Sequence, residues 1–176
     1  FNEKSSDTQA EKRLNSLINV INGNLNFKDE TELATLLENS ARNLVESDLV
    51  TFVYFNPHKK KFIAQRVWNN LSYDYIPEGT EIELNDTIVG KVVQTKFPLK
   101  VDDVEEKPII RYRKDEKIGY TGSFIAVPLA FEDEIYGVMC FENSKKKFFT
   151  GGDVNILKNT LRFYGFILFA YSTKAI

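Results

Sequence analysis

Two apolar runs that flank a short acidic tip, in the segment 122–143 (GSFIAVPLAFEDEIYGVMCFEN), limit the possible folds more than any other pattern in the chain. Each run has the length of a β-strand and the tip at Glu132 is short, so the segment predicts an antiparallel hairpin. Pro128 has no N–H to donate, which places it at a sheet edge or at a strand irregularity. Gly122 and Ser123 are small enough for the close approach of another backbone. We expect this hairpin to be scaffold, because it carries no visible catalytic group.

A second hairpin is predicted upstream. The run Leu49–Phe55 is rich in β-branched and aromatic residues, and a polar connection that contains Pro57 separates it from the run Phe62–Asn69. Strict alternation along the second run places four residues on one face, namely Phe62, Ala64, Arg66 and Trp68. An arginine does not belong on a strand face that packs only against a core. This strand is therefore expected to face more than a core.

Apolar residues at helical spacing predict three longer helices. The first lies within residues 14–25, with the stripe Leu14, Leu17, Ile18, Ile21 and Leu25. The second begins near Asp29, where an acidic first turn suits a helix N-terminus, and its apolar face carries Leu33, Leu36, Leu37, Ala41, Leu44 and Val45. The third runs from a cap at Asp153 to Tyr171, with the seam Val154, Leu157, Leu161, Tyr164 and Leu168.

The middle of the chain, Leu71–Thr121, is less regular. Thr80–Leu84 predicts a short strand, and residues 96–104 predict another extended piece. Between them Asp86 is expected to cap a short helix that carries Ile88, Val89, Val92 and Val93. The charged and aromatic segment 105–122 reads as a long loop, and loops of that length in compact domains are usually functional.

Composition excludes several classes of protein. The 176 residues suffice for one domain with a real core, and 43% hydrophobic with 27% charged residues is typical of globular chains. A net charge of −2 gives no overall support for a nucleic-acid groove. The longest apolar run, 163–171, is too short to span a membrane, and no signal peptide is visible after Phe1. We therefore expect a cytoplasmic piece of a longer protein, without nucleic-acid or membrane contacts of its own.

Few residues offer metal or redox chemistry. The one cysteine, Cys140, can form neither an internal disulfide nor a cysteine-based zinc site, and its apolar strand predicts an inert buried thiol. The acidic clusters at 102–106 and 132–134 lack the spacing of a calcium loop, so they are expected to be solvated. No metal or other cofactor is expected.

The order of these motifs resembles that of the GAF domain, a small sensory module of signalling proteins, over residues 29–172. The resemblance rests on a helix that leads into the hairpin 49–69 and on the passage TIVGKVVQTKFPLKVDD at 87–103. It continues with SFIAVPLAFEDEIYGVMCFEN at 123–143 and with the ending FTGGDVNILKNTLRF at 149–163.

The resemblance implies an α+β fold with an antiparallel sheet of five or six strands. The terminal helices would pack on one face, and the other face would hold a small-molecule pocket roofed by the middle insert. In this reading residues 1–28 form a linker helix for coupling or dimerisation and 29–172 form the domain. Residues 173–176 would begin a linker to an output domain.

Some members of the family bind cyclic nucleotides through an Asn-Lys…Phe…Asp-Glu signature, which is only partly present. Asn143, Phe149 and Asp153 match it, whereas Ser144 and Val154 stand where a lysine and a glutamate would be. Phe149 as the anchor of a turn and Asp153 as a helix cap are the plainer interpretation.

Other activities of the family find less support. Its free-methionine sulfoxide reductases need several cysteines, and its bilin carriers need a cysteine in the insert, whereas Cys140 is the single cysteine. Haem binding usually requires an axial histidine. The one histidine, His58, lies in a polar turn and is expected to be solvated rather than a haem ligand. We expect no enzymatic activity.

Arginines and aromatic residues near the implied pocket are the candidate ligand contacts. Arg66 and Arg111 could clamp a carboxylate or phosphate, and the aromatic residues suit a planar ligand or simply fill a core. The candidates are Tyr54, Arg66, Trp68, Tyr73, Tyr75, Arg111, Tyr112, Tyr120 and Ser123.

The expected function is that of a ligand-binding regulatory domain, cut from a larger bacterial-type signalling protein such as a two-component sensor. An unidentified small molecule would bind it, a homodimer would form through the terminal helices, and an effector domain in the same chain would receive the signal. The alternative is a ligand-free dimerisation or spacer module of the same fold.

Overall fold

The computed structural model describes residues 29–70, 76–106, 109–116 and 122–174, with side chains through residue 172. Its helices are α2 (Glu30–Ala41), α3 (Ile88–Thr95) and α4 (Gly151–Lys174). Its strands are β1 (Leu49–Asn56), β2 (Lys61–Asn69), β3 (Leu99–Val101), β4 (Ser123–Phe131) and β5 (Glu134–Asn143). The predicted helix at 14–25, and with it the proposed linker 1–28, lies outside the described residues.

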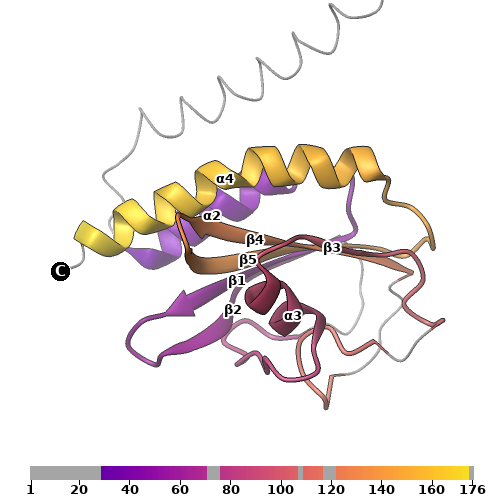
Figure 1. Ribbon diagram of the computed structural model, residues 1–176, viewed down its shortest axis with the longest axis horizontal. Helices are drawn as coiled ribbons and strands as arrows, with labels where there is room; N and C mark the ends of the chain where they lie inside the picture. The colour runs from indigo at the N-terminus through magenta and orange to yellow at the C-terminus, as the bar shows by residue number, and fades with distance from the viewer. Residues whose placement is uncertain (1–28, 71–75, 107–108, 117–121, 175–176) are drawn as a thin grey trace, which may run out of the picture.

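The five strands form one antiparallel sheet in the order β2-β1-β5-β4-β3. Both predicted hairpins are present, as β1–β2 and β4–β5. Helices α2 and α4 lie side by side on one face of the sheet, and α3 lies on the other face (Figure 1). The α+β fold class is thus confirmed, with five strands.

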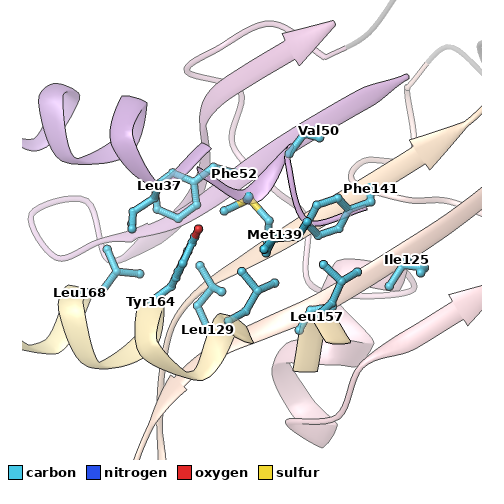
Figure 2. Close-up of a cluster of buried hydrophobic side chains, with 14 of the residues drawn as sticks. Leu37, Val50, Phe52, Ile125, Leu129, Met139, Phe141, Leu157, Tyr164 and Leu168 are labelled. Atoms are coloured by element: carbon cyan, nitrogen blue, oxygen red, sulfur yellow. The ribbon is translucent and has the colours of Figure 1, made fainter. Parts of the chain in front are cut away.

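The larger core lies between the sheet and the two long helices. Along α2 and α4, buried residues recur at helical spacing, and alternate residues of β1, β4 and β5 point toward them. Figure 2 shows these side chains converging from both layers. The cluster includes Leu33, Leu37, Val50, Phe52, Ile125, Leu129, Met139, Phe141, Leu157, Leu161, Tyr164 and Leu168.

Side-chain caps begin the two long helices. Helix α2 begins next to Asp29, as predicted, and Asp29 caps it by accepting a hydrogen bond from Glu32 N at 2.9 Å. The start of α4 differs from the prediction, because Thr150, not Asp153, precedes the first helical residue. Asp153 N donates to Thr150 Oγ1 at 3.2 Å, and Thr150 N donates back to Asp153 Oδ2 at 2.7 Å. The two residues form a capping box, so Asp153 caps the helix from its third position.

A β-bulge in β2 corrects the predicted alternation. The register between β1 and β2 shifts after Phe52, so that Phe52 faces Arg66 whereas Val53 faces Ala64. The extra residue, Gln65, reverses which side chains point to which face. Phe62 and Ala64 therefore pack on the α3 side, and Arg66 and Trp68 turn to the helix side.

The middle of the chain also departs from prediction in two details. Residues 80–84 do not form the predicted strand, and Glu81 makes only an isolated β-bridge to Ile63. The cap of α3 is Thr87, whose Oγ1 accepts from Gly90 N at 3.0 Å, and Asp86 instead adopts a left-handed conformation with φ 60°. Residue-by-residue propensity does not distinguish two adjacent capping residues.

Both edges of the sheet are blunted. Backbone bonds from Ala64 N to Thr80 O and from Ile82 N to Phe62 O, each 2.9 Å, lay residues 80–82 along the outer edge of β2. At the opposite edge β3 pairs only with residues 124–126, and β4 continues beyond it through Pro128, which has no N–H. Pro128 therefore lies at a sheet edge, as its chemistry requires.

Helix α4 crosses β4 without an intervening side chain. A Cβ atom added to Gly165 would lie 2.5 Å from the carbonyl carbon of Ala130 and closer still to its oxygen. Only glycine allows the helix backbone to approach the strand this closely.

Candidate functional site

The face of the sheet opposite α2 and α4 is covered by α3 and the segments around it. A second apolar cluster fills this space, with Val53, Phe62, Ala64, Ile82, Val89, Val92, Val104, Tyr112, Phe124, Ala126, Val138 and Cys140. The Tyr112 ring meets Phe124 edge-on, with ring centroids 6.0 Å apart. The pocket implied beneath the insert is thus packed, in the described residues, by the protein's own side chains.

Three charged side chains are buried at the border of this packing, and we call them the Arg111 cluster (Arg111, Glu116 and Glu142). The Arg111 guanidinium contacts Glu142 Oε1 through Nη1 and Glu116 Oε1 through Nε, the latter at 3.3 Å. Burial disfavours the charge of Arg111, yet Glu142, Tyr112 and Glu116 together hold its pKa above the ordinary value. Arg111 therefore stays a cation although its residue is only 5% exposed.

Backbone hydrogen bonds fix the segment that carries Arg111. Ile88 N donates to Ile110 O at 2.9 Å and Val89 N donates to Arg111 O at 3.2 Å, which satisfies the first N–H groups of α3. Glu83 N donates to Tyr112 O at 2.9 Å. With its carbonyls held by α3 and Glu83, the segment presents its own N–H groups to Glu116.

Two buried hydroxyl groups lie on the same face of the sheet. Thr51 Oγ1 and Tyr112 OH are buried neighbours that make no hydrogen bond of good geometry among the described residues. Thr51 pairs with Cys140 across β1 and β5, and burial, followed by Cys140 and Glu142, raises the pKa of Tyr112. Unsatisfied buried polar groups cost stability and often mark functional positions.

Three of the candidate residues lie on the other face of the sheet. Tyr54 belongs to the helix-side core, and burial raises its pKa to about 12, with smaller contributions from Glu30 and Tyr171. Arg66 pairs with Glu38 of α2 at 3.8 Å and with Glu78 at 3.7 Å, and Arg42 lies 5.3 Å from the ring centre of Trp68. The structure therefore separates Tyr54, Arg66 and Trp68 from the Arg111 cluster.

The remaining candidates fall into three groups. Arg111 and Tyr112 are adjacent and buried, whereas Ser123 donates to Lys145 O at 2.7 Å and supports a turn. Tyr73, Tyr75 and Tyr120 lie outside the described residues. Sequence reasoning missed Thr51, Glu116 and Glu142. An acidic residue that continues the apolar face of a strand, as Glu142 does after Val138 and Cys140, was the available signal.

An open groove lies near the tip of the β1–β2 hairpin. Its volume is about 370 Å³. The groove is lined by the paired rings of Phe55 and Phe62 and by Lys60, Lys61, Arg113 and the segment 81–84. Within the described ranges, no group of three or more metal-binding side chains is gathered. Nor does any helix in that part of the chain have the length and hydropathy to cross a membrane.

Comparison with known proteins agrees with this architecture. The family model described as a GAF domain matches residues 28–168. The chain belongs to the GAF family. Among solved structures, the GAF domain of an Acinetobacter phosphoenolpyruvate-protein phosphotransferase superposes with a TM-score of 0.74 at 14% identity, covering 94% of this chain and 95% of that one.

Two further proteins that this chain resembles carry different functional names. The Nif-specific regulatory protein of Herbaspirillum seropedicae is 26% identical over 138 residues, which are 77% of this chain and 21% of that protein. This chain thus spans about a fifth of the length of that relative. The free methionine-R-sulfoxide reductase of Neisseria meningitidis, solved with its substrate, superposes with a TM-score of 0.69 at 17% identity over 96% of this chain and 94% of that one.

The thiol of Cys140 is expected to be unreactive in the native domain. Burial, followed by the charge of Glu142, raises its pKa well above the ordinary value, which disfavours the thiolate needed for attack at neutral pH. At pH 8 a disulfide reagent such as DTNB should label it only after denaturation. One equivalent of rapid labelling of the native protein would contradict this expectation.

Proposed function

We propose that this GAF domain is a regulatory module that binds a small molecule beneath the segment 109–116. It acts on an effector domain in the same parent chain. The observation that carries the proposal is the gathering of buried polar groups on one sheet face, namely the Arg111 cluster with Thr51 Oγ1 and Tyr112 OH. A ligand at this place would displace the Tyr112 ring, replace its apolar contacts and supply partners to these hydroxyls, and its binding would then shift the population away from the closed packing.

Coupling would run through the terminal helices. Helix α4 packs along the sheet and leaves Phe166 42% exposed, an apolar group suited to a helix-mediated homodimer. Ligand binding would then shift the population between two packings of the helices. A strict monomer by light scattering at high concentration would contradict the dimer.

A cytoplasmic location is part of the proposal, since the one cysteine is a free thiol.

We propose regulation rather than catalysis. The reductases that share the fold act on free methionine sulfoxide by the name they carry. Here Cys140 is fully buried between β1 and β4, where its raised pKa disfavours nucleophilic chemistry.

A ligand-free spacer is the second candidate, and the dense packing around Tyr112 favours it. A thermal-shift and native mass-spectrometry screen separates the two, because a ligand of the native state raises its apparent stability. Failure of nucleotides, amino acids and organic acids to shift the melting temperature would support the ligand-free spacer over the ligand-binding domain.

Removal of the unsatisfied hydroxyls sharpens this test. Thr51→Val and Tyr112→Phe keep the side-chain shape and should change the free energy of unfolding by no more than about 1 kcal/mol each, because the two hydroxyls make only a poorly aligned contact with each other. They should also weaken any ligand found in the screen at least about tenfold, through the loss of its partners. Tyr164→Phe is the matched control, since its buried hydroxyl lies in the helix-side core. Ligand affinity that is equal in all three variants would overturn the proposed site.

A further inference from the structure

The carboxylate of Glu116 is held in the way that proteins hold a bound anion. Three consecutive backbone N–H groups donate to it: Arg111 N at 2.7 Å to Oε1, and Tyr112 N at 2.7 Å and Arg113 N at 3.1 Å to Oε2. The Arg111 Nε adds a fourth donor at 3.3 Å. Successive backbone N–H groups that point to one centre form an anion-binding nest, and we call these four donors the 111–113 nest.

The enclosure of this carboxylate exceeds what a surface turn provides. The Glu116 side chain is only 4% exposed, and both of its oxygens are engaged by two donors each. The neighbouring Asp115 contrasts with it, since its carboxylate is 72% exposed and pairs with Arg113 at the surface. The nest is therefore a built site with an occupant from its own chain.

Of the two carboxylates in the Arg111 cluster, Glu116 is the exchangeable one. Glu142 belongs to β5, where it pairs with Leu49 of β1 on one side and with Phe124 of β4 on the other. Glu116 lies in a connection, and its donors are only three to five residues away in the chain. Removing Glu142 from Arg111 would disturb the sheet, whereas removing Glu116 requires a rearrangement of a single turn.

We propose that the 111–113 nest is a carboxylate-binding site that Glu116 fills in the ligand-free domain, and that the sensed molecule is a small organic acid whose carboxylate replaces it. This inference rests on the proposed function for its biological meaning. A carboxylate matches the nest because it presents two coplanar oxygens, each able to accept two hydrogen bonds. The exchange also keeps the charge beside Glu142 constant, whereas a phosphate dianion would add a negative charge next to it.

Acetate added to the Glu116→Ala variant tests the nest directly. Truncation leaves the four donors without their acceptor and should lower the melting temperature. Sodium acetate should then restore it with a saturable rise of roughly 3 °C or more, because it binds the folded state. Acetamide, which has the same shape without the charge, and sodium chloride at equal ionic strength should not. Wild type and Asp115→Ala are the controls, and neither should show this rise.

The result that overturns the inference is an acetate response of Glu116→Ala no larger than that of Asp115→Ala. Should Glu116→Ala fail to fold, Glu116→Gln serves, because one side of its amide is a donor and fits the nest poorly. Acetate should stabilise that variant more than acetamide does, and an equal response would refute the site.

Failure of the nest and failure of the sensor have different signatures. An acetate response in Glu116→Ala together with an empty ligand screen on the wild type supports the nest and refutes the sensor. A wild-type ligand without a carboxylate refutes the proposed ligand class. A carboxylic acid ligand that binds Glu116→Ala at least about tenfold more tightly than wild type supports both, because the internal competitor has been removed.

Discussion

Replacement of Arg111 by methionine should destabilise the domain by about 3–5 kcal/mol, the effect of removing one partner from a buried ion pair. The loss arises because Glu142 and Glu116 are left as buried carboxylates without the guanidinium that they contact. Methionine keeps much of the apolar volume of the arginine stem, so the change reports the lost charge more than lost packing. Urea denaturation followed by fluorescence measures the free energy of unfolding.

Arg113→Met is the matched control for this change. Arg113 lies two residues away and pairs with Asp115 at 2.7 Å, but its side chain is 34% exposed and that of Asp115 is 72% exposed. An exposed pair of this kind contributes less than about 1 kcal/mol. The added change Glu142→Gln should recover part of the loss in Arg111→Met, because it removes one of the two buried charges that the guanidinium no longer contacts. Equal effects of Arg111→Met and Arg113→Met would show that the Arg111 cluster is not a buried ion pair in solution.

Replacement of Gly165 by alanine should cost about 2–4 kcal/mol, although alanine is the better helix former. The added methyl group meets the backbone of Ala130, which has no side-chain freedom with which to move away. Helix α4 must therefore lift from β4 and loosen the core that includes Leu161 and Leu168. The melting temperature should fall by roughly 5–10 °C, as followed by circular dichroism.

Gly151→Ala provides the comparison at the first residue of the same helix. A Cβ atom at Gly151 meets nothing within 4 Å, so the gain in helix propensity is unopposed. This variant should be as stable as the wild type or more stable by up to about 1 kcal/mol. A Gly165→Ala protein as stable as Gly151→Ala would mean that α4 does not approach β4 as described.

The architecture could be predicted from sequence wherever local patterns decided it. The hairpin 122–143, with its two apolar runs and short tip, pairs as β4 and β5, and the seam Leu157–Leu168 faces the sheet. Each of these elements needs only neighbouring residues to reveal its period. The family resemblance then supplied the order of the layers, which local patterns do not contain.

The site was less predictable, because it depends on a bulge and on contacts between distant residues. The bulge at Gln65 cannot be recognised in the sequence, yet it reverses which face of the sheet each later side chain of β2 points to. Arg66 was therefore assigned to the wrong side of the sheet. Arg111 was predicted as a candidate, but its partner Glu142 is 31 residues away in the sequence. Glu116 could not be distinguished from the other acidic residues of a charged loop. No spacing rule links such partners before the fold brings them together.

The blunted edges of the sheet restrict how copies of this domain can meet. A neighbouring chain finds Phe62 and Ala64 of β2 already engaged by residues 80–82, and finds proline on β4 beyond a three-residue β3. Both edges of the sheet therefore disfavour strand pairing between chains, which is the route to amyloid-like fibres.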